Sequence, residues 1–142
     1  MSIPQYKVIY SPEANEDLKA IYRYIAIDLG EKGTAKNQTE RIRRKIHGLT
    51  TFPEKYKAVE WKPWSEINMR QVVIDKYVAC YLVDNGKQLV TVVRIFYGGR
   101  DIQNLRESLI IQCRAEVRKI YGRMLSKRRR NTDVFQGVLA RL

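Results

Sequence analysis

The stretch that decides the fold covers residues 68–101, where three β-rich segments follow one another. The chain reads NMRQVVIDKYVACYLVD over 68–84 and QLVTVVRIFYGGRD over 88–101. β-Branched and aromatic residues, which are typical of strands, dominate all three segments, and short polar breaks separate them. The second break contains Asn85-Gly86, a pair that favours a two-residue hairpin turn with positive φ at both residues. We therefore predict a three-stranded antiparallel meander.

A short strand and two amphipathic helices are predicted before the meander. The alternating segment at 6–10 ends at Ser11-Pro12, where Ser11 suits a helix N-cap and Pro12 the first helical position. Apolar residues then recur at helical spacing as far as Gly30. This predicted inward stripe consists of Ala14, Leu18, Ile21, Tyr22, Ile25 and Leu29. A second helix is predicted over 34–51, with Ile42, Ile46 and Leu49 directed inward.

The order of elements predicts an α+β fold. Helical spacing of apolar residues from Ile102 to Met124 adds a third helix after the meander. The order β-α-α-β-β-β-α is typical of a two-helix hairpin packed on a small antiparallel sheet, with the other sheet face open to a ligand or partner. We expect one compact domain over 1–108 and a basic helical C-terminal extension over 109–142.

Composition favours a polyanionic partner. The 142 residues include 27 basic and 15 acidic side chains, a net charge of +12. Such an excess favours nucleic acid first, an acidic protein second and a membrane surface third. The chain has no apolar run long enough to span a membrane and no signal-peptide pattern at its start, so we expect a cytoplasmic protein. Its two cysteines, Cys80 and Cys113, predict neither a disulfide framework nor a metal site.

Several classes of enzyme are disfavoured by missing motifs. The sequence has no phosphate-binding loop, dinucleotide fingerprint, nucleophile elbow or zinc-ligand spacing. Its single histidine, His47, lies in the second predicted helix without a nearby nucleophile or carboxylate, so we interpret it as structural. We therefore expect no cofactor and no metal.

Cleavage of RNA without a metal remains chemically open. This reaction needs a base for the 2′-hydroxyl, an acid for the leaving oxygen and cations around the phosphate. Arg70, Arg94 and Arg100 are candidates for the cations, because a guanidinium stays charged at any working pH. Tyr97 or Tyr77 qualifies as acid or base only if positive charge lowers its pKa, and both are otherwise half-buried strand residues.

Each of these candidates has an ordinary structural alternative. Arg94 either pairs with a carboxylate at the sheet edge or faces a ligand, and Arg100 either enters a cleft or pairs with the neighbouring aspartate. Trp61 lies in a loop with Lys57 and Lys62, a mixture that can stack bases and hold phosphates. The same loop is equally well explained by tryptophan packing beneath solvated lysines.

Taken together, the residues resemble the RelE/ParE superfamily of bacterial type II toxin–antitoxin toxins, over about residues 5–106. The resemblance implies a compact α+β toxin silenced by a cognate acidic antitoxin. It allows two mechanisms, since RelE-like members cut mRNA on the ribosome and ParE-like members poison DNA gyrase. Four segments carry it: YKVIYSPEA with DL and IYRYI (6–25), MRQVV (69–73), YVACYLVD (77–84) and VVRIFYGGRD (92–101).

The resemblance also assigns residues, with two departures. Arg70 matches a basic position on the first meander strand, and Arg100 matches an arginine that the ribonuclease branch uses at its phosphate. Tyr97 stands where relatives have His, Tyr or an apolar residue. Val78 replaces an arginine found in many members, and Phe96 stands where one ribonuclease subgroup has a histidine. Both departures remove a candidate catalytic group.

From these observations we predict a toxin that inhibits translation as a ribosome-dependent mRNA endoribonuclease, or mRNA interferase. Its partners would be the ribosome, mRNA and an antitoxin that docks where the third helix, 102 to about 125, lies. Catalysis is assigned to Arg70, Tyr97 and Arg100. RNA binding is assigned to Lys57, Trp61, Lys62, Tyr77 and Arg94. The alternatives are a ParE-like DNA gyrase inhibitor and a catalytically weak nucleic-acid-binding relative.

Overall fold

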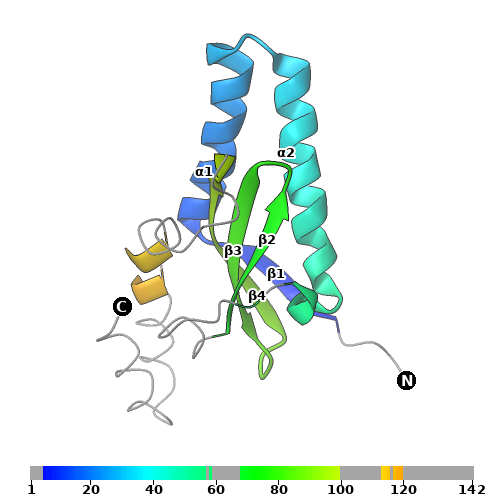
Figure 1. Ribbon diagram of the computed structural model, residues 1–142. Coiled ribbons are helices and arrows are strands. Elements are labelled where there is room, and N and C mark those ends of the chain that lie inside the picture. The colour runs from blue at the N-terminus through cyan, green and yellow to red at the C-terminus, as the bar shows by residue number, and fades with distance from the viewer. Residues whose placement is uncertain (1–4, 57, 59–67, 100–112, 116, 120–142) are drawn as a thin grey trace.

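Two helices cover one face of a four-stranded sheet in the computed structural model (Figure 1), which describes residues 5–56, 58, 68–99, 113–115 and 117–119. This arrangement confirms the predicted α+β class. The strands are β1 (Lys7–Tyr10), β2 (Met69–Ile74), β3 (Tyr77–Asp84) and β4 (Leu89–Tyr97). The helices are α1 (Pro12–Arg23), a π-helical turn η1 (Tyr24–Asp28), α2 (Lys32–His47), and the 3₁₀ turns η2 (Gly48–Thr50) and η3 (Pro53–Lys55).

The sheet is mixed, with strand order β1-β4-β3-β2. The predicted meander is confirmed, because β2 pairs antiparallel with β3 and β3 with β4. The first strand, however, pairs parallel with β4, so the sheet as a whole is not antiparallel as predicted. β1 borders β4 only as far as the Tyr10–Val92 pair. Beyond that pair, α1 takes over the free edge of β4.

The connection between β3 and β4 differs from the predicted two-residue turn. The loop contains four residues, and its positive φ of 51° lies at Gln88 rather than at Asn85 or Gly86. The Asp84 carboxylate accepts a hydrogen bond from the Lys87 amide at 3.1 Å, which stabilises this wider loop. The prediction from the Asn-Gly pair was therefore wrong, because a local side-chain contact selected another loop geometry.

The main core lies between the sheet and the helical hairpin. Ile42, Ile46 and Leu49 are fully buried there, as predicted, against alternate residues of β3 and β4. Tyr81 is the largest side chain in this core, and its hydroxyl donates to the Pro53 carbonyl at 2.7 Å. A buried phenol thus keeps a hydrogen-bond partner while it fills the core.

The start of α1 agrees with the prediction and its end does not. The Ser11 hydroxyl accepts the Ala14 amide at 2.9 Å and donates to the Val93 carbonyl at 2.7 Å, so the N-cap also ties α1 to β4. At the other end, the Leu29 amide donates to the Tyr24 carbonyl, the i→i+5 pattern of a π-helix. The wider turn rotates the chain that follows it, so Leu29 is exposed instead of inward. Tyr22, which lies in α1 before this turn, was also predicted inward and is exposed.

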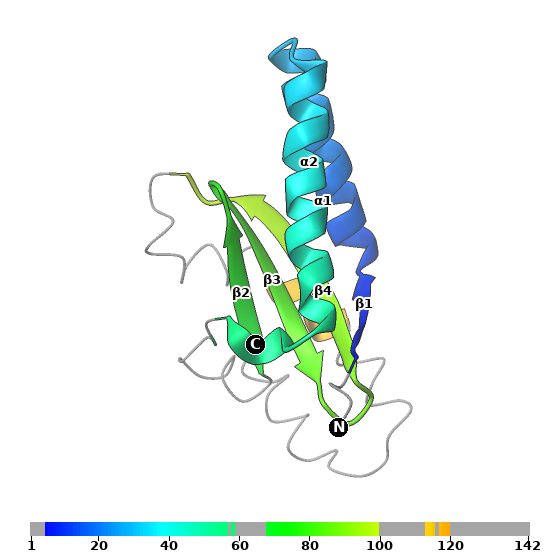
Figure 2. The ribbon, with the colours of Figure 1, turned by 90° about the vertical axis from the view of Figure 1, so that its right-hand side faces the viewer.

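The second face of the sheet is covered along β3, which corrects the prediction of an open face. Val78, Cys80 and Leu82 of β3 point to this face and are at most 7% exposed. Residues 113–115 and 117–119, here called the C-terminal segment, lie beside β3 and β4 on the side away from α2 (Figures 1 and 2). Cys113 and Val117 of this segment are fully buried.

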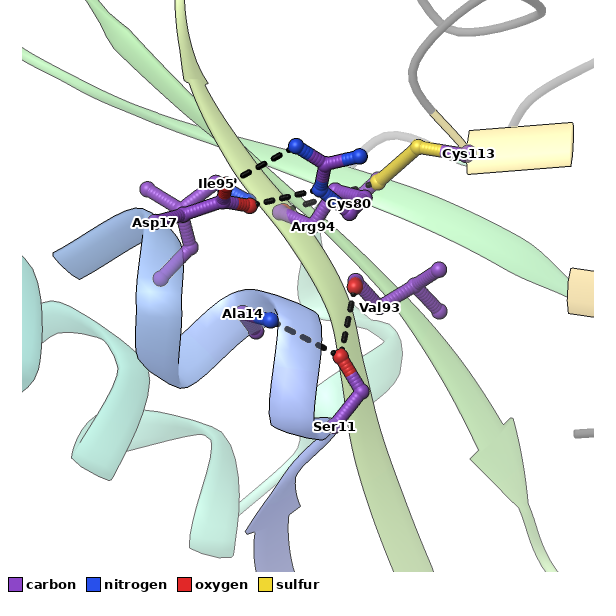
Figure 3. Close-up of a disulfide and its surroundings, with 8 residues drawn as sticks. All are labelled: Ser11, Ala14, Asp17, Cys80, Val93, Arg94, Ile95 and Cys113. Carbon is purple, nitrogen blue, oxygen red and sulfur yellow. Dashed lines mark hydrogen bonds and ion pairs between the residues drawn. A yellow bond between two sulfur atoms is a disulfide. The ribbon is translucent and has the colours of Figure 1, made fainter. Parts of the chain in front are cut away.

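A disulfide fastens the C-terminal segment to the sheet (Figure 3), although the two cysteines alone did not predict it. It joins Cys113 to Cys80 of β3. Lys119 of the segment also pairs with Glu13 of α1 at 3.1 Å. These residues are the described part of the third predicted helix, and the rest of that prediction and the basic tail after it lie outside the described residues. Within the described ranges, no helix is long and apolar enough to cross a membrane.

Candidate functional site

Tyr77 and Tyr97 form an aromatic pair at the end of the sheet. They face each other directly in the β3–β4 register, with ring centroids 5.5 Å apart in an edge-to-face arrangement. Tyr97 is 63% exposed, so its hydroxyl is available to a ligand. Burial, together with the nearby phenols of Tyr97 and Tyr24, raises the pKa of Tyr77 above its ordinary value. Tyr77 therefore stays protonated at neutral pH and is a poor general base.

Two glycines after β4 shape this pair. The amides of Gly98 and Gly99 donate to the Lys76 carbonyl at 2.8 and 3.3 Å, which folds the chain back over the β2–β3 turn. Gly99 has a φ of +61°, and a Cβ there would lie 3.0 Å from the Tyr97 ring. The glycine thus permits both the backbone turn and the close approach of the ring.

Arg70 is occupied in a structural contact. Its guanidinium donates to the Glu54 and Tyr56 carbonyls, both at 2.9 Å, to the Glu54 carboxylate at 3.1 Å and to the Asn68 side-chain oxygen at 3.0 Å. Its side chain is only 15% exposed. The three bonds to Glu54 and Tyr56 fasten the chain around η3 to the edge strand β2. A guanidinium held in this way has few donors left for a phosphate.

Arg94 takes the structural alternative that the sequence left open (Figure 3). Its Nε and a terminal nitrogen donate to the two oxygens of the Asp17 carboxylate at 2.7 and 2.8 Å, a bidentate pair. The same carboxylate accepts the Ile95 amide at 2.9 Å. β1 has already ended at this point, so the edge of β4 has no strand partner here. Asp17 of α1 therefore accepts the Ile95 amide on this edge and also neutralises Arg94.

The described residues do not bring the predicted catalytic groups together. Arg70 lies opposite Tyr81 of β3, whereas Tyr97 lies opposite Tyr77 of the same strand. Tyr77 and Tyr81 are four residues apart, so Arg70 and Tyr97 are separated by about 13 Å along the strand direction. The remaining predicted site residues lie outside the described part of the chain. These are Arg100, Lys57, Trp61 and Lys62.

The turn between α1 and α2 carries an apolar surface that was not predicted. Tyr24, Ile27 and Leu29, here called the tip surface, are 53%, 71% and 56% exposed. The helical hairpin projects past the end of the sheet at this point (Figures 1 and 2). Exposed apolar clusters and π-helical turns are both frequent at binding sites. Helical periodicity predicted that Leu29 points inward. The π-helical turn breaks this periodicity, so the sequence pattern did not reveal the exposed apolar surface.

A basic groove runs between the two helices. It encloses about 280 Å³ and is lined by Leu18, Lys19, Tyr22, Arg23, Thr39 and Arg43. Its apolar floor and cationic rim suit an amphipathic segment with acidic side chains. The groove depends on how the two helices pack, so the sequence pattern alone did not reveal it.

Comparisons with known proteins agree with this fold. The family model described as "ParE toxin of type II toxin-antitoxin system, parDE" matches residues 8–102. Among solved structures, the chromosomal ParDE toxin–antitoxin system of Pseudomonas aeruginosa aligns with a TM-score of 0.54 at 17% identity, covering 66% of this chain and 96% of that one. The RelBE2 toxin–antitoxin complex of Mycobacterium tuberculosis aligns at 0.47 and 14% identity, covering 68% and 94%. No curated protein sequence matches.

Proposed function

Because this chain belongs to the ParE toxin family of type II toxin–antitoxin systems, we propose that it stops growth by binding DNA gyrase rather than by cutting mRNA. The resemblance of its sequence to both RelE-like and ParE-like toxins leaves either target open. The position of the arginines favours DNA gyrase as the target. We place this activity in the cytoplasm, where gyrase and its DNA are found.

The engagement of Arg70 and Arg94 within the fold carries the proposal. A metal-independent ribonuclease needs cations beside its acid and base to stabilise the phosphorane. Arg70 is bound to the chain around η3, and Arg94 is bound to Asp17. Arg70 also lies four positions along β3 from the pair formed by Tyr77 and Tyr97. A protein that inhibits its target by binding needs no such group of acid, base and cations. It needs only a surface whose side chains bind the target.

We assign target binding to the tip surface. Large apolar side chains at the end of a projecting hairpin can enter a pocket on a partner, and central apolar anchors dominate binding energy at interfaces. Ile27 is 71% exposed, so replacing it should leave the fold intact. The variant Ile27→Lys should therefore lose growth inhibition while keeping the melting temperature of the wild type.

We assign antitoxin binding to the basic groove between α1 and α2. Arg43 is exposed on α2. Burial raises the pKa of Tyr10, and the positive charge of the nearby Arg43 partly offsets this rise. Arg23 faces Arg43 across the groove from α1. Acidic side chains of an antitoxin would be steered to this rim, so reversing one charge should slow association most strongly at low salt.

Two parallel assays test the proposal. Purified gyrase should lose supercoiling activity when the wild-type protein is added, and Ile27→Lys should restore it. Val73→Lys is the matched control, because Val73 is 43% exposed but lies on β2, away from the tip surface. In the second assay, primer extension on mRNA from arrested cells should show no codon-phased cuts. Such cuts, with unchanged supercoiling, would overturn the proposal.

A ribosome-dependent ribonuclease is the second candidate, and the exposure of Tyr97 favours it. This hydroxyl lies at the end of β4, directly before the Gly98-Gly99-Arg100 segment, and Arg100 would be its cation. Under this hypothesis Tyr97→Phe abolishes mRNA cutting and toxicity together. Under the gyrase proposal Tyr97→Phe remains toxic. A protein that binds nucleic acid but neither cuts mRNA nor inhibits gyrase would support the weak-relative hypothesis instead.

A further inference from the structure

The second face of the sheet carries a pair of cysteines that the proposed function does not use. Cys80 lies in the middle of β3, opposite Arg94 of β4, and Cys113 lies 33 residues further along the chain in the C-terminal segment. Both side chains are fully buried, and they are bonded to each other (Figure 3). The bond therefore joins the toxin fold to the basic extension.

Noncovalent contacts accompany the disulfide in the described part of the C-terminal segment. Val117 is buried, and Lys119 forms an ion pair with Glu13 in which Lys119 remains 61% exposed. An exposed ion pair of this kind contributes little to stability. The disulfide is the covalent link between this segment and the sheet, and breaking it should permit local opening.

We propose that Cys80 and Cys113 form a redox-controlled staple, a thiol–disulfide site that fixes the C-terminal segment over the second face of the sheet. When the pair is oxidised, Val78, Leu82 and Phe96 of that face stay covered. When it is reduced, the segment opens and the apolar face becomes available. The staple does not depend on which target the toxin binds.

The oxidant is a low-molecular-weight disulfide such as glutathione disulfide. The Cys113 thiolate attacks one sulfur of the oxidant and expels one glutathione thiolate, which leaves a mixed disulfide on Cys113. The Cys80 thiolate then attacks the Cys113 sulfur and expels the second glutathione thiolate. Two electrons pass from the protein to glutathione, and the two thiol protons end on the two released thiolates.

The surroundings of Cys113 favour this order of attack. Arg114 is exposed beside Cys113 on the same segment, and its charge attracts anionic glutathione disulfide. Cys80 is in an interior strand of the sheet, so it meets the oxidant less readily than Cys113 does when the segment opens.

Hydrogen exchange on the full chain tests the staple. The wild-type protein is equilibrated with glutathione disulfide or with a phosphine reductant, and exchange is followed in peptides containing residues 113–119 and in β3. In the oxidised protein we expect an intact mass 2 Da lower than in the reduced protein, one hydrogen lost from each of two thiols. We also expect resistance to iodoacetamide and amide exchange at least tenfold slower in residues 113–119.

Two single-cysteine variants provide the controls. Cys113→Ser and Cys80→Ala should exchange at the reduced wild-type rate, with and without the reductant. Cys113→Ser leaves the sheet untouched, so it remains informative if the substitution in β3 impairs folding. The staple is refuted if both cysteines are alkylated after treatment with glutathione disulfide. It is also refuted if oxidised and reduced wild-type proteins exchange at the same rate.

Discussion

At the scale of single residues, the arginines of the meander act mainly as structural ties. Arg94 and Asp17 are 22% and 14% exposed, and the pair sits where α1 replaces β1 along the edge of β4. Removing one member leaves a partly buried charge without its partner, so we expect Arg94→Met to lower the free energy of unfolding by roughly 2–4 kcal/mol. Urea denaturation measures this loss. Arg44→Met, on the exposed face of α2, should change stability by less than about 0.5 kcal/mol.

Asp75 makes a prediction about pH. Hydrogen bonds from Gln38 and then Arg41, both at 3.0 Å, lower the pKa of Asp75 below its ordinary value of 3.8. A carboxyl whose pKa is lowered by folding stabilises the protein above pH about 4, and this contribution is lost as the pH falls further. The Asp75 side chain is 48% exposed, so the contribution is small. Asp75→Asn should therefore be less stable than wild type at pH 7, and the difference should disappear in acid.

At the scale of elements, local patterns predicted which segments fold and side-chain contacts decided their details. The strands of the meander, the Ser11 cap and the buried face of α2 follow from alternation, capping chemistry and helical period. The π-helical turn at Tyr24–Asp28 and the wide β3–β4 loop do not. The π-helical turn depends on an extra residue in a turn of the helix, and the β3–β4 loop depends on the carboxylate of Asp84. Neither feature leaves a periodic signal in the sequence.

The loop between β3 and β4 offers a direct test of its geometry. Gln88 has a φ of 51°, a left-handed conformation that costs an ordinary residue about 1–2 kcal/mol and a glycine almost nothing. After the entropy that glycine adds to the unfolded chain, we expect Gln88→Gly to stabilise the protein by up to about 1 kcal/mol. Gly86→Ala should be tolerated, because its φ is not positive. A large loss of stability in Gly86→Ala would instead favour the two-residue turn.

At the scale of the whole molecule, the fold class followed from the sequence but the exposed surfaces did not. Alternation along β3 identifies two faces, yet it cannot tell which face solvent reaches. The C-terminal segment covers the face that the sequence left open, and its contacts join residues far apart in the chain, such as Glu13 with Lys119. Two of the predicted catalytic residues, Arg70 and Tyr97, lie apart on the sheet, and the third, Arg100, lies outside the described residues. Arg70 is held by residues around η3 that no pattern on its own strand reveals.

The rim of the basic groove predicts how the whole toxin meets an acidic antitoxin. We expect Arg43→Glu to reduce the association rate with a cognate antitoxin about tenfold at low salt, and the difference should shrink as salt is added. Stopped-flow binding at two ionic strengths measures both effects. Arg44→Glu changes the charge equally on the same helix but does not line the groove. Equal effects from the two substitutions would indicate general charge attraction instead of docking in this groove.

Supercoiling by purified DNA gyrase tests the central claim most directly. Wild-type protein should inhibit supercoiling in a dose-dependent manner, and Ile27→Lys at the same concentration should not, although both proteins melt at the same temperature. This result would place gyrase inhibition on the tip surface. Full supercoiling activity at every concentration of a folded wild-type toxin that still arrests growth would contradict the account.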